Sequence, residues 1–180
     1  MSGPLETVLA PAHAGTWHLD TDQSTCRFTV RDKLVTTVHG TMPATAGIIT
    51  IDGSGRVTSA FVEVGVKGIA TGNSHRDADL AKPHFLDLAH HPTVRITVEA
   101  TGTGEQAVSA RSVVEARGVH APITLEVQPS AQYENEVTLS VTGRLDRRPL
   151  GIRVPTFIIG RFIDLDAVLT FRRASAYGSD

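Results

Sequence analysis

The chain is poor in aromatic residues and in cysteine, and it carries no excess of either charge. Its 180 residues include six Phe, two Tyr and one Trp, too few for a site that encloses a ligand between several rings. The single cysteine excludes an internal disulfide framework and any zinc or iron–sulfur site built from several thiolates. Lys and Arg number 17 against 19 Asp and Glu. Because nucleic-acid binding depends on basic contacts to phosphates, we expect no nucleic-acid partner.

The first residues also lack the features of a secretory signal. They contain no Lys or Arg, Glu6 precedes the apolar stretch, and Pro11 interrupts it. No apolar run approaches the roughly 20 residues that a membrane-spanning helix needs. We therefore expect a cytoplasmic protein without a membrane span, with a flexible lead over residues 1–15 and a short tail over residues 174–180.

What the chain does have is a surplus of β-branched residues arranged with period two. Val, Thr and Ile together number fifty, and such residues suit a pleated sheet better than a helix. Apolar and polar residues alternate in several segments. They are residues 26–31, 60–66, 93–100, 123–128, 137–142 and 165–171. Strands of this kind bury one face and expose the other, which is typical of antiparallel sheets.

Turn residues divide this pattern into about eight strands within one all-β domain. Asp52-Gly53-Ser54-Gly55 predicts a hairpin between two of the strands. The one predicted helix is a short insertion near residues 74–88, beginning at Ser74 and running to Leu80 or on toward Leu88. Many strands with one apolar face predict a sandwich or a closed barrel, and eight strands can close around one ligand.

The densest polar cluster lies at the start of this helix, and two interpretations of it stay open. In the structural one, Ser74 and Asp77 form a capping box, and Arg76 pairs with a nearby carboxylate. In the functional one, His75 and Arg76 lie at the mouth of a pocket, where the planar guanidinium binds an anionic head group.

Histidine is frequent, but its spacing does not indicate a metal site. Four of the eight histidines fall between residues 75 and 91, namely His75, His84, His90 and His91. None of them forms a known ligand motif, and adjacent residues of an extended chain point to opposite faces. We expect no metal and no cofactor.

Nucleophilic catalysis has no signature either. There is no GxSxG elbow, and Cys26 shares the face of Phe28 and Val30, which predicts a small, inert core residue. Arg147-Arg148 after Asp146 is interpreted as a solvated strand end, with an anion-binding site as the alternative.

Segments spread over residues 16–173 resemble the YceI-like family, in the order and with the spacing of its motifs. They are Trp17 to Asp20, Ser24, Phe28-Thr29-Val30, Val38-His39-Gly40, Thr71-Gly72-Asn73, Arg76-Asp77, Leu80, Phe85, Asp87, His91-Pro92, Gly118-Val119, Pro122, Arg147 and Gly151-Ile152. The resemblance implies an extended, lipocalin-like antiparallel β-barrel over residues 16–173 whose interior holds a polyisoprenoid chain. It also favours a homodimer.

Together with the alternation, the resemblance implies an apolar cavity with a polar mouth. The residues expected to line the cavity are Phe28, Val30, Val38, Val62, Val64, Phe85, Ile96, Leu125, Leu139 and Phe171. The head-group candidates are His75, Arg76 and His84. The sequence departs from the family pattern at Asp32 and Asp79, where the family often has His. It also departs at Leu86, which replaces one of a Phe pair, and at Pro149-Leu150, which replaces an acidic–aromatic pair. The few aromatics thus predict a barrel that holds an aliphatic chain loosely.

These expectations predict a protein, not an enzyme, that sequesters or carries an isoprenoid or other amphipathic lipid. Burying one five-carbon unit contributes roughly 4 kcal/mol at about 0.8 kcal/mol per CH₂. Two alternatives remain. One is an enzyme acting on a lipid-like substrate in the same cavity, with His75, Asp77 or His84 as acid–base groups. The other is a stress-related interaction scaffold, which predicts a closed cavity and an exposed apolar patch.

Overall fold

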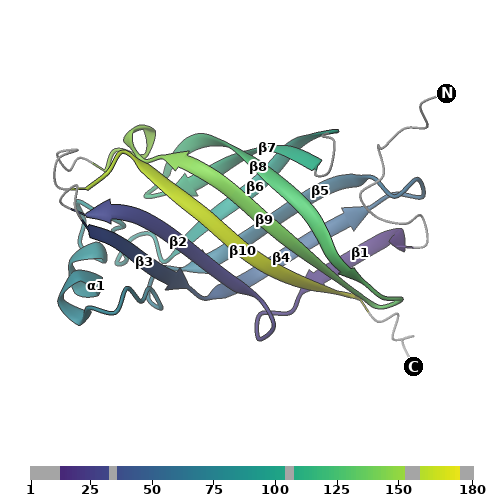
Figure 1. The fold of residues 1–180 in the computed structure, drawn as a ribbon, viewed down its shortest axis with the longest axis horizontal. Helices are drawn as coiled ribbons and strands as arrows, with labels where there is room; N and C mark the ends of the chain where they lie inside the picture. Colours follow the sequence, from purple (N-terminus) through teal and green to yellow (C-terminus); the bar gives the residue numbers. More distant parts are fainter. Residues whose placement is uncertain (1–12, 33–35, 104–107, 153–158, 175–180) are drawn as a thin grey trace.

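Ten antiparallel strands form one sheet in the computed structural model, which describes residues 13–32, 36–103, 108–152 and 159–174 (Figure 1). The strands are β1 (Gly15–Leu19), β2 (Thr25–Asp32), β3 (Thr36–Met42), β4 (Ala44–Ile51), β5 (Val57–Gly65), β6 (Thr93–Thr103), β7 (Val108–Ala116), β8 (Val119–Gln132), β9 (Glu136–Asp146) and β10 (Phe162–Arg173). A helix, α1 (Ser74–Leu80), lies between β5 and β6, and a 3₁₀ turn, η2 (Arg148–Leu150), follows β9.

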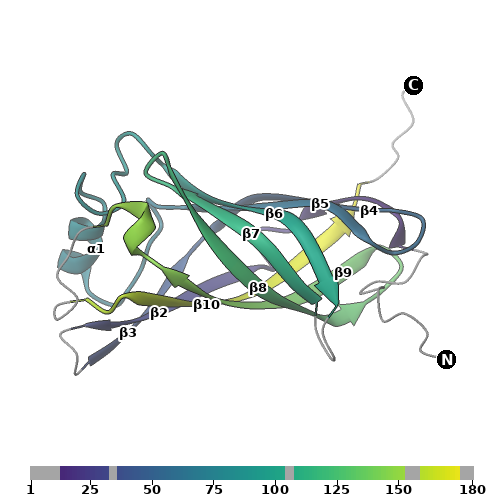
Figure 2. The same ribbon diagram turned by 90° about the horizontal axis from the view of Figure 1, so that it is seen from above.

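Eight of these strands close into a barrel because β1 pairs with both β4 and β10. The other two, β2 and β3, form a hairpin attached to the same edge of β10, but nearer its start: Leu165 pairs with Phe28, whereas Phe171 pairs with Leu19. Figures 1 and 2 show the hairpin extending the wall toward the end where α1 lies. The expected all-β barrel of about eight strands is confirmed.

The period-two alternation explains why the chain folds this way. In β8, residues 121, 123 and 125 are buried and residues 120, 122, 124 and 126 are exposed, so one face of the strand turns inward. The hairpin predicted at Asp52 is also confirmed. Asp52 Oδ1 accepts hydrogen bonds from the backbone N–H groups of Ser54 and Arg56, and Gly55 adopts φ +84°, a conformation that favours glycine.

The predicted helical insertion is shorter than its widest expected extent. The helix ends at Leu80, and residues 81–88 continue as turns in which Leu86 and Leu88 donate their backbone N–H groups to the carbonyls of Leu80 and Ala81. Pro83 accounts for the end, because proline has no N–H to donate and disfavours helical geometry at the residue before it.

The barrel end away from α1 is filled by what we call the floor cluster. It consists of Trp17, Ile49, Ile51, Val137, Leu139, Leu169 and Phe171. Trp17 is fully buried, its Nε1 donates to the His13 carbonyl at 2.8 Å, and the Arg173 guanidinium lies 4.6 Å from its ring centre. His13 is itself buried, so the packed chain begins ahead of residue 16. The remainder of the predicted lead and tail, residues 1–12 and 175–180, lies outside the described residues.

A second group of buried residues lies along β7, β8, β9 and η2, and we call it the wall cluster. Its members are Ala110, Val114, Ala116, Ala121, Ile123, Leu125, Leu145, Leu150 and Ile152. The two clusters leave the rest of the barrel interior, toward β2, β5, β6 and the first half of β10, less tightly filled.

Candidate ligand-binding cavity

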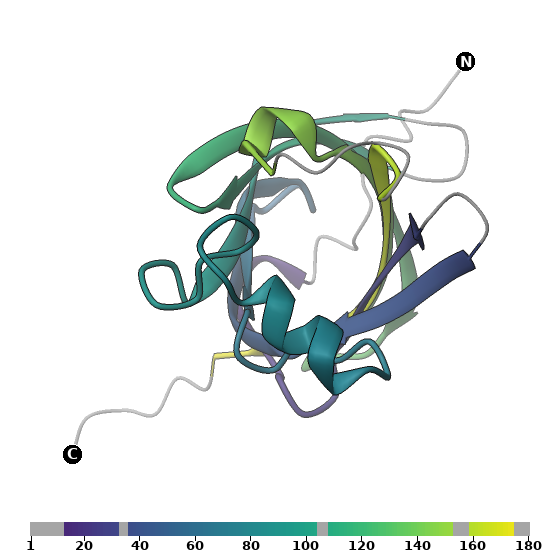
Figure 3. The same cartoon turned by 90° about the vertical axis from the view of Figure 1, so that its left-hand side faces the viewer.

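A cavity of about 610 Å³ runs from the floor cluster to the end of the barrel where α1 lies. Figure 3 looks along the barrel from that end, with α1 in teal and the η2 turn in light green. All ten residues predicted to line an apolar cavity lie on its wall. They are Phe28, Val30, Val38, Val62, Val64, Phe85, Ile96, Leu125, Leu139 and Phe171.

Burial differs between the two sides of this cavity. Most inward-facing residues in the middle of β7 and β8, such as Val114 and Ile123, are almost fully buried. The inward-facing residues of β2, β5, β6 and the first half of β10 are only partly buried although they point into the barrel. They are Cys26, Phe28, Val30, Ala60, Val62, Val64, Val94, Ile96, Val98, Ile163, Leu165 and Ala167. Apolar side chains on this side therefore face an unfilled space.

One wall position depends on a glycine. Phe28 of β2 pairs with Gly40 of β3, and a Cβ atom built on Gly40 would lie 2.2 Å from Phe28 Cζ. The ring of Phe28 can lie across β3 only because residue 40 has no side chain. The small residue in the Val38-His39-Gly40 motif thus sets the width of the cavity at this point.

One group of polar residues lines the cavity near α1, at what we call the mouth: Thr71, Asn73, His75, Arg76 and Asp79. Thr71 organises them. It donates its backbone N–H and its hydroxyl to Asp77 Oδ1, and it accepts hydrogen bonds from Arg76, whose Nε reaches Thr71 Oγ1 at 2.8 Å and whose Nη2 reaches the Thr71 carbonyl at 2.9 Å. One threonine therefore holds both charged side chains, and Asp77 does not form the predicted capping box with Ser74.

The helix cap differs from the prediction. Asn73, not Ser74, is the N-cap: its backbone is extended and its Oδ1 accepts the Arg76 N–H at 3.1 Å. Asn and Ser are about equally good caps. Because Asp77 is turned toward Thr71, it does not complete the reciprocal contact that a cap at Ser74 requires.

The three head-group candidates separate in the structure. His75 and Arg76 line the mouth. His84 does not belong to the lining: it is exposed, and its ring packs against Phe85 at a centre-to-centre distance of 4.7 Å. Among the described residues, no hydrogen bond joins His75, Asp77 and His84, so the convergence required of an acid–base pair is not observed.

Arg147 contradicts the interpretation of Arg147-Arg148 as a solvated strand end. Only 2% of it is exposed. Its Nη1 donates to the Ile152 carbonyl at 2.6 Å, its Nη2 to Ile159 at 2.8 Å and its Nε to Gly160 at 2.9 Å. Burial lowers the pKa of this guanidinium below its ordinary value. The resemblance signalled this arginine, but the local sequence did not, since its partners come later in the chain.

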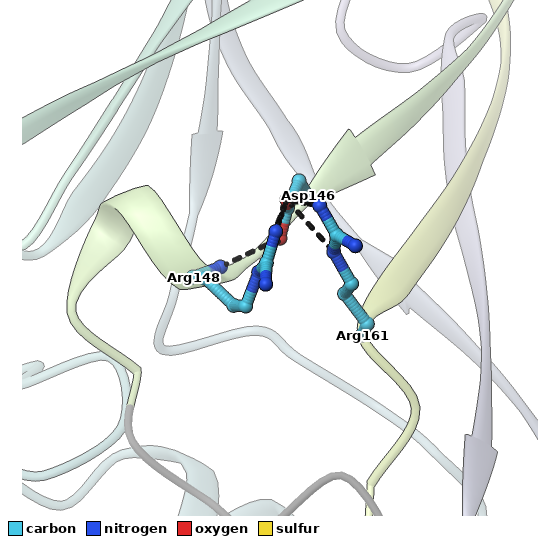
Figure 4. Close-up of polar contacts among 3 residues, drawn as sticks. All are labelled: Asp146, Arg148 and Arg161. Carbon is cyan, nitrogen blue, oxygen red and sulfur yellow. Dashed lines mark hydrogen bonds and ion pairs between the residues drawn. The ribbon is translucent and has the colours of Figure 1, made fainter.

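Asp146 and Arg148, by contrast, do lie on the outside. Asp146 Oδ2 accepts hydrogen bonds from Arg148 Nη2 at 3.0 Å and from Arg161 Nη2 at 2.8 Å (Figure 4). The alternation of β9 thus ends by turning Asp146 outward and Arg147 inward.

Arg117 joins two parts of the mouth. Its Nη2 donates to the Pro83 carbonyl at 2.9 Å and its Nη1 to the Leu150 carbonyl at 3.3 Å. The cavity is lined by Leu150, which carries one of these carbonyls, and by Phe85 and Leu86, which follow Pro83 in the chain. One side chain therefore holds the segment after α1 against η2.

Comparison with known families identifies this architecture. The profile of the YceI-like domain matches residues 17–171. The chain belongs to the YceI-like family. No curated protein matched the sequence.

Solved structures share the YceI-like fold at low identity. BcnA of Burkholderia cenocepacia has a TM-score of 0.74 at 14% identity, over 84% of this chain and 98% of that one. A polyisoprenoid-binding domain of Saccharophagus degradans has 0.68 at 15% identity, over 88% and 98%. The YceI protein of Campylobacter jejuni has 0.69 at 16% identity, over 78% and 88%.

Two departures from the YceI-like pattern lie on the cavity wall. Leu86 and Leu150, where the resemblance implies aromatic residues, both face the cavity near its mouth. Asp79, a third departure, also lies there, and Lys82 Nζ is 2.6 Å from its Oδ1. The shortage of aromatic residues therefore falls at the entrance of the cavity.

The residues that the structure describes include no group of three or more His, Cys, Asp or Glu side chains arranged to hold a metal ion. They also include no helix of the length and apolar character needed to cross a membrane.

Proposed function

We propose that this protein binds a long-chain amphipathic lipid, of the isoprenoid type, with its tail inside the barrel and its head group at the mouth. The observation that carries the proposal is the cavity of about 610 Å³, whose apolar walls stay partly uncovered. Its size lies within the range of small-molecule sites, about 300–1,000 Å³.

The chemistry of the wall favours an aliphatic occupant. Water fills a cavity stably only where polar groups offer it two to four hydrogen bonds. Around Val62, Ile96 and Leu165 the neighbouring wall is aliphatic, so ordered water has few partners there. An aliphatic tail in the same space contributes about 0.8 kcal/mol per buried CH₂.

Arg76 is the residue we assign to the head group, with His75 beside it. The hydrogen bonds to Thr71 fix the orientation of the Arg76 guanidinium at the rim of the cavity. A guanidinium held in this way suits a phosphate or carboxylate. Arg147 is a poorer candidate because its three nitrogens already donate to carbonyls.

A related structure supports the class of ligand. The Saccharophagus degradans domain, described as polyisoprenoid-binding, shares the fold over most of both chains. Within the described part of the chain, neither alternative function has an observation in its favour. An enzyme needs an available acid–base group, but Asp77 Oδ1 already accepts two hydrogen bonds from Thr71. An interaction scaffold needs a continuous exposed apolar patch, but among the exposed large apolar residues Tyr133 lies at the opposite end of the barrel from Val119 and Phe162. The cytoplasmic location and the homodimer stay predictions.

The experiment places a charge in the cavity. Ile96→Arg puts a guanidinium among apolar wall residues, whereas Thr97→Arg places the same group on the outer face of the same strand. Purified proteins are extracted with organic solvent, reloaded with geranylgeranyl diphosphate and weighed by native mass spectrometry. Wild type and Thr97→Arg should retain the lipid and Ile96→Arg should not. Equal retention by a correctly folded Ile96→Arg protein would show that the lipid binds elsewhere.

A further inference from the structure

We infer that the cavity buries lipid tails only up to about twenty carbons, or four isoprene units, because it is closed at one end. This inference rests on the proposed function and adds to it a limit on the length of tail that the barrel encloses. It follows from the position of the floor cluster, from the length of the wall and from the volume of the cavity.

The closed end lies in the floor cluster. Ile49, Leu139, Leu169 and Phe171 face the cavity, while the remaining members, among them Trp17, lie behind them and do not line it. Trp17 is fully buried and is fixed by its hydrogen bond to the His13 carbonyl and by the Arg173 guanidinium over its ring. A tail that enters at the mouth therefore stops at this layer.

The length of the wall gives the first estimate. Strand β10 runs from Ile163, beside the mouth residues, to Phe171 in the floor cluster, and both residues line the cavity. At about 3.3 Å per residue and a strand tilt of roughly 40°, this stretch spans about 20 Å along the barrel axis. An extended chain advances about 1.2 Å per bond, so about sixteen main-chain carbons fit. Each isoprene unit has four such carbons, which makes four units.

The volume gives an independent second estimate. A non-hydrogen atom with its hydrogens takes up about 30 Å³ in a liquid, the share of one water molecule. A cavity of about 610 Å³ therefore holds about twenty such atoms. Four isoprene units contain that number of carbons, so the two estimates agree. A tail twice as long leaves half of its carbons outside the apolar wall.

Small residues near the floor set this depth. Ala167 of β10 lies two residues before Leu169, lines the cavity and packs against the floor cluster, and Ala60 of β5 does the same from another wall. A phenylalanine at either position fills the space of about one isoprene unit. Val168, the next residue of β10, does not line the cavity and points to the other face of the sheet.

The test uses linear all-trans prenols of 10, 15, 20, 30 and 40 carbons, offered as an equimolar mixture in detergent micelles to the delipidated protein. Native mass spectrometry reports which prenols are retained. Each added unit up to 20 carbons should raise the affinity about tenfold or more, because it is fully buried, and longer tails should bring no further gain. Ala167→Phe should move this break to 15 carbons, and Val168→Phe should leave it at 20.

The outcomes separate the two proposals. If no prenol of any length is retained, the proposed function fails. If retention continues to rise to 40 carbons, the protein binds isoprenoids but the length limit is overturned. A folded Ala167→Phe protein whose break stays at 20 carbons also overturns it. If Ala167→Phe does not fold, Ala60→Phe, on β5, should move the break to 15 carbons in the same way, and its result then decides between the outcomes.

Discussion

Arg147 shows how a single residue holds the mouth together. A buried cation is costly unless it is well paired or hydrogen-bonded, and here the planar guanidinium donates to three backbone carbonyls. These carbonyls belong to Ile152, Ile159 and Gly160, which lie on both sides of the connection between η2 and β10. Arg147 therefore ties these three described residues together at the end of the barrel where α1 lies.

The first prediction follows from this arrangement. Arg147→Met fills a similar volume but leaves the three carbonyls without their donor, so the free energy of unfolding should fall by about 2–4 kcal/mol. Arg148→Ala is the matched control, since its side chain is 54% exposed and should cost less than about 1 kcal/mol. Urea unfolding followed by tryptophan fluorescence measures both. Equal losses in the two variants would contradict the structural role of Arg147.

Cys26 gives a second prediction, on pH. It faces the cavity, and burial raises the pKa of its thiol from 9.0 to about 11. Since only the thiolate reacts, alkylation of the native protein by iodoacetamide should keep accelerating beyond pH 9 and level off near pH 11. In urea the rate should level off near pH 9. The native state also binds more protons than the unfolded state in this window, so the contribution of Cys26 to stability falls as the pH rises from about 9 to 11.

Mass spectrometry after timed quenching measures the reaction without ambiguity, because the chain has one cysteine. A native profile that levels off near pH 9 would show that the thiol is solvated and does not face an apolar space.

At the scale of elements, the mouth is assembled from segments far apart in the sequence. The hairpin between β7 and β8 has a two-residue turn, Arg117-Gly118, in which both residues have positive φ, +56° and +70°. Asn-Gly is the usual choice for such a turn, because Asn tolerates this backbone region. Arginine at this position is explained by its side chain, which reaches Pro83 and Leu150.

The substitution Arg117→Asn tests whether Arg117 holds the segment after α1 in place. It keeps a residue that suits the turn and removes both hydrogen bonds to the mouth. The backbone N–H groups of Phe85, Leu86 and Leu88 should then exchange with solvent roughly tenfold faster, since a hydrogen bond to a charged group contributes about 1.5–3 kcal/mol. Arg111→Asn, in the exposed part of β7, should leave them unchanged. Hydrogen exchange resolved by mass spectrometry measures the difference, and unchanged protection in Arg117→Asn would contradict the link.

Alternation within a strand was enough to predict the inward face of most wall residues, because side chains alternate strictly along an extended chain. Phe85 lies outside the strands, and the resemblance to the YceI-like pattern predicted it instead. Val62 and Ile96, chosen from separate strands, pair directly across β5 and β6. Positions outside strands were harder. His84 follows Pro83 in a series of turns whose direction depends on contacts with Arg117, and these contacts come from a distant hairpin. The choice between Asn73 and Ser74 as the cap depends on Thr71, which draws Asp77 away.

For the whole molecule, the closed barrel explains why the inner faces of the strands could be predicted and why the pairing at the edge of β10 could not. Every strand in the ring has a partner on each side. Because each strand also buries one face, the inner faces of the barrel follow from the local alternation of apolar and polar residues. The division of the β10 edge between β1 and β2 is a long-range property, and no local pattern predicts it. This division makes the barrel longer than its eight-stranded ring and places the β2–β3 hairpin along the cavity, where Phe28, Val30 and Val38 line it.

A cavity of this size also makes the stability of the whole barrel depend on its occupant. A ligand that binds only the folded state at about one hundred times its dissociation constant stabilises that state by about 2.7 kcal/mol. For a chain of this length the melting temperature should then rise by roughly 5–10 °C. Delipidated protein and protein loaded with geranylgeranyl diphosphate should differ by this amount in calorimetry, and so should the two forms of Thr97→Arg. Ile96→Arg should melt at the same temperature in both forms, because its cavity is occupied by the side chain. An equal rise in all three proteins would mean that the lipid acts from the surface, and the unfilled apolar wall would then need another explanation.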